Sequence, residues 1–71
     1  MRKLVILNGS GDESVEFSPE DHSAAAVRFA TLMDSEHGTA FALDKEGNSK
    51  KITEFDPEAN EVIVVGPYVG G

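Results

Sequence analysis

Cysteine and tryptophan are both missing from this 71-residue sequence, and only six of its side chains are basic. Without cysteine the chain can form neither a disulfide nor a thiolate metal site, so a hydrophobic core must hold the fold together. A chain of this length buries a small core and has room for one domain. Apolar residues make up 39% and charged residues 27% of it, a composition typical of a globular domain.

The few basic side chains are outnumbered by 13 acidic ones, which gives a formal charge of −7. Phosphate groups are bound mainly by lysine and arginine, and these residues are scattered along the chain. We therefore expect no binding to nucleic acid or to an anionic membrane, and the charge favours basic protein partners. The carboxylates are scattered as well. A role in solubility is therefore favoured over mimicry of DNA, which needs acidic rows.

Long apolar runs are also absent. The run Leu4–Leu7 near the start is followed at once by Asn8 and Gly9. A signal peptide needs about 7 to 15 apolar residues, and a membrane helix needs about 18 or more. We therefore expect no secretory signal and no membrane span, which places the protein in the cytoplasm or in a particle assembled there.

Two short apolar runs, Leu4–Leu7 and Val62–Val65, are rich in β-branched residues and are bounded by turn formers. Such runs are typical of strands buried on both faces, which lie at the centre of a sheet. Alternating or mostly polar stretches predict three further strands, over 13–17, 39–44 and 49–55. Turn residues at 8–12 and 45–48 predict two hairpins, the first with a long turn.

One helix of about 17 residues is predicted between the second and third strands. Ser18 has the chemistry of an N-cap, Pro19 suits the first helical position, and Gly38 suits the end of the helix. Between them, apolar residues recur at spacings of three and four, at Ala25, Phe29, Leu32 and Met33. This stripe is predicted to face the core.

The order of these elements, β-β-α-β-β-β, predicts an α+β fold. If the two apolar strands are parallel central neighbours, their hairpin partners flank them and the helix packs across one face of a mixed sheet. This arrangement is β-grasp-like. Another strand order, or a loop in place of the fourth strand, remains an alternative. The domain is expected over residues 1–65, with a C-terminal tail over 66–71.

Candidate catalytic groups are few. His22 and His37 lie near opposite ends of the predicted helix, too far apart to share one ligand set. The segment Asn8–Gly11 lacks the third glycine and the lysine of phosphate-binding loops, so a hairpin turn explains it better. Four carboxylates lie close together in a solvated strand end and turn, at Glu54, Asp56, Glu58 and Glu61. We predict no enzymatic activity, no cofactor and no dedicated metal site.

The most informative segment is the tail, Gly66-Pro67-Tyr68-Val69-Gly70-Gly71. Glycine has no Cβ and wide conformational freedom, so a Gly-Gly end can extend into a narrow cleft and present its carboxylate there. The order of elements, together with residues 61–71, resembles the β-grasp sulfur carriers. These are the small subunit of molybdopterin synthase and the thiamine-pathway carrier, relatives of ubiquitin.

This resemblance implies a function in which Gly71 is the attachment residue. An E1-like, ATP-dependent enzyme would adenylate its carboxylate, which would then become a thiocarboxylate or be joined to an amine. Gly70 would supply the flexible approach, and Pro67, Tyr68 and Val69 would contact the partner.

A second class of function is a small acidic structural or interaction protein without carrier chemistry, such as a bacteriophage accessory or virion-associated protein. The tail would then be a binding arm anchored by Tyr68. An unpaired edge strand, expected at Glu13–Phe17 or Ser49–Phe55, would also allow pairing with a second copy of the chain.

Overall fold

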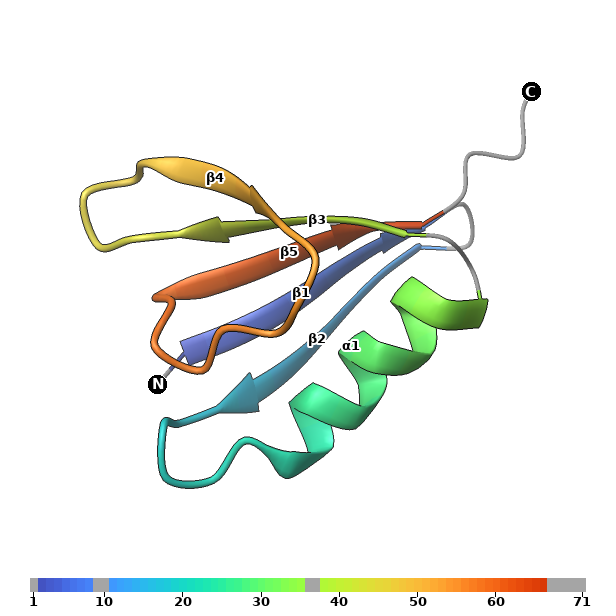
Figure 1. The fold of residues 1–71 in the computed structure, drawn as a ribbon, viewed down its shortest axis with the longest axis horizontal. Helices are drawn as coiled ribbons and strands as arrows, with labels where there is room; N and C mark the ends of the chain where they lie inside the picture. The colour runs from blue at the N-terminus through green and yellow to red at the C-terminus, as the bar shows by residue number, and fades with distance from the viewer. Residues whose placement is uncertain (1, 9–10, 36–37, 67–71) are drawn as a thin grey trace.

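The structure is a computed structural model that describes residues 2–8, 11–35 and 38–66. In chain order, its elements are β1 (Arg2–Asn8), β2 (Gly11–Phe17), α1 (Ser23–Ser35), β3 (Thr39–Leu43), β4 (Ser49–Ile52) and β5 (Glu61–Val65) (Figure 1). The predicted α+β order is confirmed, and the fourth strand is present. Within the described ranges, no helix has the length and apolar character needed to cross a membrane.

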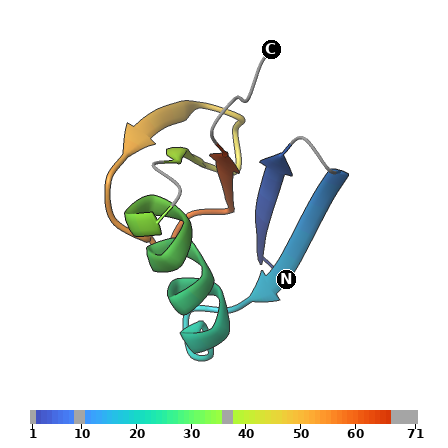
Figure 2. The same cartoon turned by 90° about the vertical axis from the view of Figure 1, so that its right-hand side faces the viewer.

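The strands form one mixed sheet in the order β2-β1-β5-β3-β4. The central neighbours β1 and β5 run parallel, whereas β1–β2, β5–β3 and β3–β4 are antiparallel. This is the β-grasp-like order expected from the two apolar strands. The sheet curves around α1, which lies on one side of it (Figure 2).

The hydrophobic core lies between α1 and the face of the sheet that the helix covers. The sheet contributes buried side chains from Leu4, Ile6, Phe17, Ala40, Ala42, Val62 and Val64. The helix contributes Ala25, Phe29 and Leu32, with Met33 partly buried against them. The predicted helical stripe is therefore confirmed, and its spacing explains why this side of the helix faces the sheet.

The helix begins at Ser23, four residues later than an N-cap at Ser18 predicts. Ser18 does accept a hydrogen bond through Oγ from the Asp21 backbone N–H, at 3.1 Å. The same two residues also exchange backbone hydrogen bonds of 3.0 and 3.1 Å, which close a separate turn. The predicted start is therefore wrong, because Ser18 stabilises this turn rather than the first turn of the helix.

The far end of the helix is closed by Gly38, as predicted. Its backbone N–H donates to the carbonyl oxygen of Leu32 at 3.2 Å. A Cβ at position 38 would lie 2.9 Å from Cγ1 of Val64. Glycine is therefore required here because the chain that leads from α1 to β3 passes close to the side chain of Val64.

Both hairpins are confirmed, but the first is tighter than predicted. β2 begins at Gly11, which pairs with Asn8, so only positions 9 and 10 separate the two strands. Those two positions lie outside the described residues. In the second hairpin Gly47 has a φ of 88°, a left-handed conformation that favours glycine.

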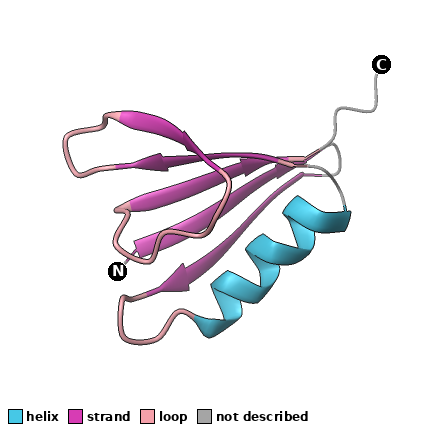
Figure 3. Cartoon of the chain, viewed as in Figure 1, coloured by secondary structure: helices cyan, strands magenta, loops and turns pink. Residues whose placement is uncertain are grey.

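The fourth strand is shorter than predicted, because β4 ends at Ile52. The chain then leaves the sheet along the loop that Figure 3 shows between β4 and β5. In this loop, the ring of Phe55 packs edge-to-face against Phe17 and Phe29, at centroid distances of 5.0 and 5.6 Å. Phe55 thus contributes to the core from a loop instead of from a strand.

The side of the sheet away from α1 carries a second set of apolar side chains, and we call it the open face. Register and alternation place Val5, Leu7, Phe41, Leu43, Ile63 and Val65 on it. None of them belongs to the buried cluster: Leu7 is 36% exposed and the others are half-buried. The expectation that the central strands are buried on both faces is therefore wrong, because α1 covers one face only.

Candidate functional site

The predicted attachment and partner-binding residues lie outside the described residues, namely Pro67, Tyr68, Val69, Gly70 and Gly71. The structure instead defines the residue that precedes them. The backbone N–H of Gly66 donates to the carbonyl oxygen of Leu7 at 2.9 Å, which continues the pairing of β5 with β1. The chain is therefore fixed to the centre of the sheet up to position 66.

The row of side chains level with Val65 is apolar at its centre and polar at its two ends. Val65 lies in register with Leu7 of β1 on one side and with Thr39 of β3 on the other. The next residue along this row is Asp12 of β2. A partner that bound this end of the sheet would contact apolar surface continuous with the open face.

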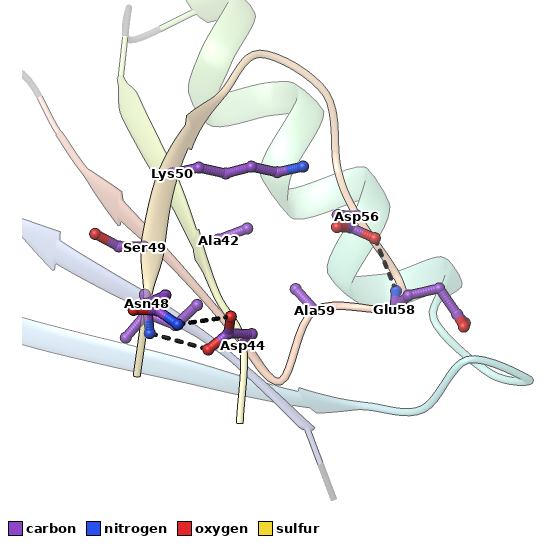
Figure 4. A pocket seen from close by; sticks show the side chains of 9 residues that line it. Ala42, Asp44, Asn48, Ser49, Lys50, Asp56, Glu58 and Ala59 are labelled. Carbon is purple, nitrogen blue, oxygen red and sulfur yellow. Dashed lines mark hydrogen bonds between the residues drawn. The ribbon is translucent and has the colours of Figure 1, made fainter. Parts of the chain in front are cut away.

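A second candidate site is a cavity of about 300 Å³ between the β3–β4 hairpin and the loop before β5 (Figure 4). Its polar lining residues are Asp44, Asn48, Ser49, Lys50, Asp56 and Glu58. The sequence grouped Asp56 and Glu58 with Glu54 and Glu61. The structure instead places Asp56 and Glu58 opposite the β3–β4 hairpin. The backbone N–H of Asn60 donates to the carbonyl oxygen of Leu43 at 2.9 Å, which holds the loop beside the hairpin.

Two of the three carboxylates that line this cavity, those of Asp44 and Asp56, accept hydrogen bonds within their own turns. Oδ1 of Asp44 accepts hydrogen bonds from the backbone N–H groups of Glu46 and Asn48, both at 2.9 Å. Oδ1 of Asp56 accepts one from the backbone N–H of Glu58, also at 2.9 Å (Figure 4). Across residues 2–8, 11–35 and 38–66, no group of three or more acidic or histidine side chains is placed to hold a metal ion. Turn formation accounts for these residues.

The turn at Asp44 should make the second hairpin sensitive to pH. The Asn48 backbone N–H, followed by the Asn48 side-chain amide and the Glu46 backbone N–H, holds the pKa of Asp44 below its ordinary value. Because the folded pKa is the lower one, the stabilisation is complete above the unfolded pKa and is lost as pH falls through the folded pKa. We expect Asp44→Ala to lower the urea midpoint more near pH 7 than near pH 2.5.

The variant Asp44→Asn is the matched control for this prediction. It keeps an acceptor oxygen for the turn but carries no charge, so its urea midpoint should change less with pH between the same limits. Chemical-shift titration of the Asp44 carboxyl carbon measures the pKa directly. A midpoint at the ordinary value for aspartate, about 3.9, would contradict the expectation.

His22 lies one residue before α1 and is half-buried. Its ring stacks on Phe55 with a centroid distance of 5.9 Å, and its Nδ1 lies 3.0 Å from the carbonyl oxygen of Pro19. The second histidine, His37, lies outside the described residues. Packing and one local polar contact account for His22.

Charged side chains surround the apolar part of the open face unevenly. Asp12 and Glu16 lie on the β2 side, and Lys51 lies on the β4 side in register with Phe41. Lys3 lies in register between Glu16 and Glu61. The open face thus has an apolar centre with acidic residues on β2, a lysine on β4, and a charged row of Glu16, Lys3 and Glu61 at one end.

Comparison of the chain with protein-family models, with curated proteins and with solved structures gives no match. The β-grasp-like assignment rests on the strand order and on the placement of α1 across one face of the sheet. Any functional conclusion rests on the residues themselves and on their placement in this fold.

Proposed function

We propose that this protein is a non-enzymatic carrier of the ubiquitin-like, sulfur-carrier type, which presents a Gly70-Gly71 carboxylate to a partner enzyme in the cytoplasm. The supporting observation is the place of β5. It is the middle strand of the sheet, hydrogen-bonded to β1 on one side and to β3 on the other. Central strands open least readily, so β5 is a firm base for a segment that must enter another protein's cleft.

The chemistry of the proposal lies at Gly71. An E1-like enzyme adenylates its carboxylate with ATP and releases pyrophosphate. A sulfide-level sulfur nucleophile or an amine then displaces AMP from the acyl adenylate, which gives a thiocarboxylate or an amide. Gly70 allows an extended approach because it has no Cβ. Pro67, Tyr68 and Val69 contact the partner, and the −7 charge of the chain favours a basic surface on it.

Intact mass measurement of the chain isolated from its native cell tests the carrier proposal. We expect a species in which sulfur replaces one carboxylate oxygen of Gly71, or one in which Gly71 is joined to another molecule. Deleting Gly70 and Gly71 should abolish this species. The deletion should leave the melting temperature unchanged, because β5 ends at Val65. Val27→Ala, on the exposed side of α1, is the control that should keep the modification.

The carrier proposal would be refuted by two results together. One is a free carboxylate on Gly71 in all of the native material. The other is full function of the Gly70-Gly71 deletion in the cell. A gene for an adenylating enzyme beside the gene of this protein would support the carrier proposal. Neighbouring genes for capsid or tail proteins would favour the alternative below.

The incompletely buried apolar side chains of the open face favour a second candidate function, that of a small acidic interaction or structural protein, such as a virion-associated one. Its binding surface would be the open face or an edge strand instead of the tail. The two edges of the sheet are β2 and β4, which correspond to the two edge strands predicted from the sequence, although β4 ends earlier, at Ile52. Under this alternative, substitutions on the open face abolish function and loss of Gly70 and Gly71 does not.

A further inference from the structure

The edge of the sheet at β2 has no neighbouring strand among the described residues. β2 is the outermost strand, with β1 on its inner side, and it forms the border of the sheet that lies away from β4 (Figure 2). Its outer side carries the backbone N–H and C=O groups that do not bond to β1. A row of unpaired backbone groups of this kind is a template for another extended segment.

The register identifies the residues of β2 whose backbone faces outward. The N–H of Gly66 donates to the carbonyl oxygen of Leu7, so the backbone of Leu7 bonds toward β5. Bonding directions alternate along a strand, and the even-numbered residues of β1 therefore bond toward β2. Their partners in register on β2 are Gly11, Glu13, Val15 and Phe17. The residues left facing outward are Asp12, Ser14 and Glu16.

The other edge of the sheet is less suited to accept a strand. β4 is four residues long and carries Lys50 and Lys51, and short length and lysine are features that protect an edge from pairing. The N–H of Asp44 donates to the carbonyl oxygen of Asn48, so by alternation only Ser49 and Lys51 of β4 face outward. β2 is seven residues long and contains neither lysine nor proline. It is therefore the edge that can pair with a further strand.

β2 is held firmly on the side that faces α1. Phe17 is 2% exposed within the core, and Val15 packs against the core partly buried. The carboxylate of Glu13, on the same side, pairs with Arg28 of α1 at 3.0 Å. A strand that binds to this edge therefore meets an ordered template and does not have to order it.

The side chains of the outward residues lie on the open-face side and carry a surplus of negative charge. The row of Asp12 across β1, β5 and β3 contains no basic side chain. In the row of Glu16, one lysine, Lys3, lies between two acids, because Glu61 is on its other side. These two rows together leave a charge of −2 uncompensated, so basic side chains on a partner would be complementary to this edge.

We propose that β2 accepts an antiparallel β-strand from a basic partner protein. The three outward residues of β2 exchange up to six backbone hydrogen bonds with this strand. Basic side chains of the partner lie opposite Asp12 and Glu16, an apolar one lies opposite Val15, and a β-branched one lies opposite Ser14. Read along the partner from the Glu16 end, the recognised pattern is basic, apolar, β-branched, neutral, basic.

The same charges disfavour a second copy of this chain as the occupant. Antiparallel pairing of β2 with β2, centred on Ser14, would place Asp12 opposite Glu16 twice, which is unfavourable. The β4 strand of a second copy has two outward residues instead of three and would form at most four hydrogen bonds. Two chains that each carry a charge of −7 also repel one another, whereas a basic partner is attracted.

Titration of the full chain with the peptide acetyl-Thr-Lys-Val-Thr-Thr-Lys-Thr-amide, followed by amide NMR shifts, tests this proposal. We expect a dissociation constant of about 0.1 to 1 mM, with shift changes concentrated at Asp12, Ser14 and Glu16. The matched control is the same peptide with a methyl group on the backbone nitrogen of its central threonine. It has the same charge but cannot donate to the carbonyl oxygen of Ser14, so it should bind at least about tenfold more weakly.

Variants of the chain separate the backbone contribution from the charge contribution. Ser14→Pro removes an outward N–H that does not bond to β1, so it should keep the fold and lose peptide binding by more than about tenfold. Ser14→Ala keeps this N–H and should bind as the wild type does. Asp12→Asn should weaken binding about threefold at low salt. Glu46→Gln, which makes the same charge change in the exposed β3–β4 turn, should not weaken it.

Three results would overturn this proposal. The first is no shift change at β2 with about 1 mM peptide. The second is equal binding of the N-methylated peptide, which would show attraction between charges without strand pairing and does not require Ser14→Pro to fold. The third is a shift change at β2 when the chain alone is concentrated, which would make β4 of a second copy the occupant. Deletion of Gly70 and Gly71 should leave peptide binding unchanged, so this test and the mass measurement succeed or fail separately.

Discussion

Replacing Phe29 with alanine is expected to cost about 3 to 5 kcal/mol of unfolding free energy. Phe29 is 3% exposed at the middle of the interface between α1 and the sheet, and its ring lies edge-to-face with Phe55. Alanine would remove these contacts and leave a cavity that the rigid sheet fills poorly. A domain of this length has only on the order of 4 to 10 kcal/mol of stability, so the variant should be close to unfolding.

Urea denaturation followed by circular dichroism measures this loss. Phe29→Leu fills part of the cavity and should cost about 1 to 2 kcal/mol, which keeps the measurement possible if the alanine variant is unfolded. Val27→Ala on the exposed side of the same helix should change stability by less than about 0.5 kcal/mol. A loss below about 1 kcal/mol for Phe29→Ala would show that this side of α1 does not face the core.

Replacing Gly38 with alanine is expected to cost about 1 to 3 kcal/mol through crowding. The added Cβ would meet Cγ1 of Val64 at 2.9 Å and the carbonyl oxygen of Val65 at 3.4 Å. Val64 is fully buried and β-branched, so it cannot turn away easily. The connection from α1 to β3 would have to move slightly away from Val64.

A double-mutant cycle with Val64→Ala tests this cause. With Cγ1 removed, Gly38→Ala should cost less than about 1 kcal/mol, so the two changes should be non-additive. Gly47→Ala is the matched control. It is strained by a φ of 88° with open space around the added Cβ, so its cost should be the same in both backgrounds. Full additivity of Gly38→Ala with Val64→Ala would contradict the crowding explanation.

The strand order could be predicted because burial constrains it strongly. Leu4–Leu7 and Val62–Val65 carry apolar side chains on both faces, which only central strands tolerate, and this places β1 beside β5. The helical stripe was predictable for the same reason. The start of α1 was not, because Ser18 has hydrogen-bonding chemistry that suits both an N-cap and a closed turn, and the turn prevails.

The candidate sites differ in how far the sequence predicts them. The tail residues Gly70 and Gly71 were proposed from their chemistry alone and lie outside the described residues, and the structure adds the place of Gly66 at the end of the central strand. The cavity was missed because its lining comes from two loops that β3–β5 pairing brings together. The open face was misassigned to the core, since an apolar strand reveals that a face must be covered but not whether the same chain covers it.

The parallel pairing of β1 with β5 has a consequence for how the chain is made. Leu4 and Val62 are in register although 58 residues separate them, so the middle strand of the sheet is the last strand to leave the ribosome. Until then β1 and β3 have no partner strand between them, and the apolar side of α1 lacks the centre of the sheet to pack on. Pairing over this separation makes folding slow and places it late in translation. Chains that stop before residue 61 should therefore be rapid substrates for proteolysis.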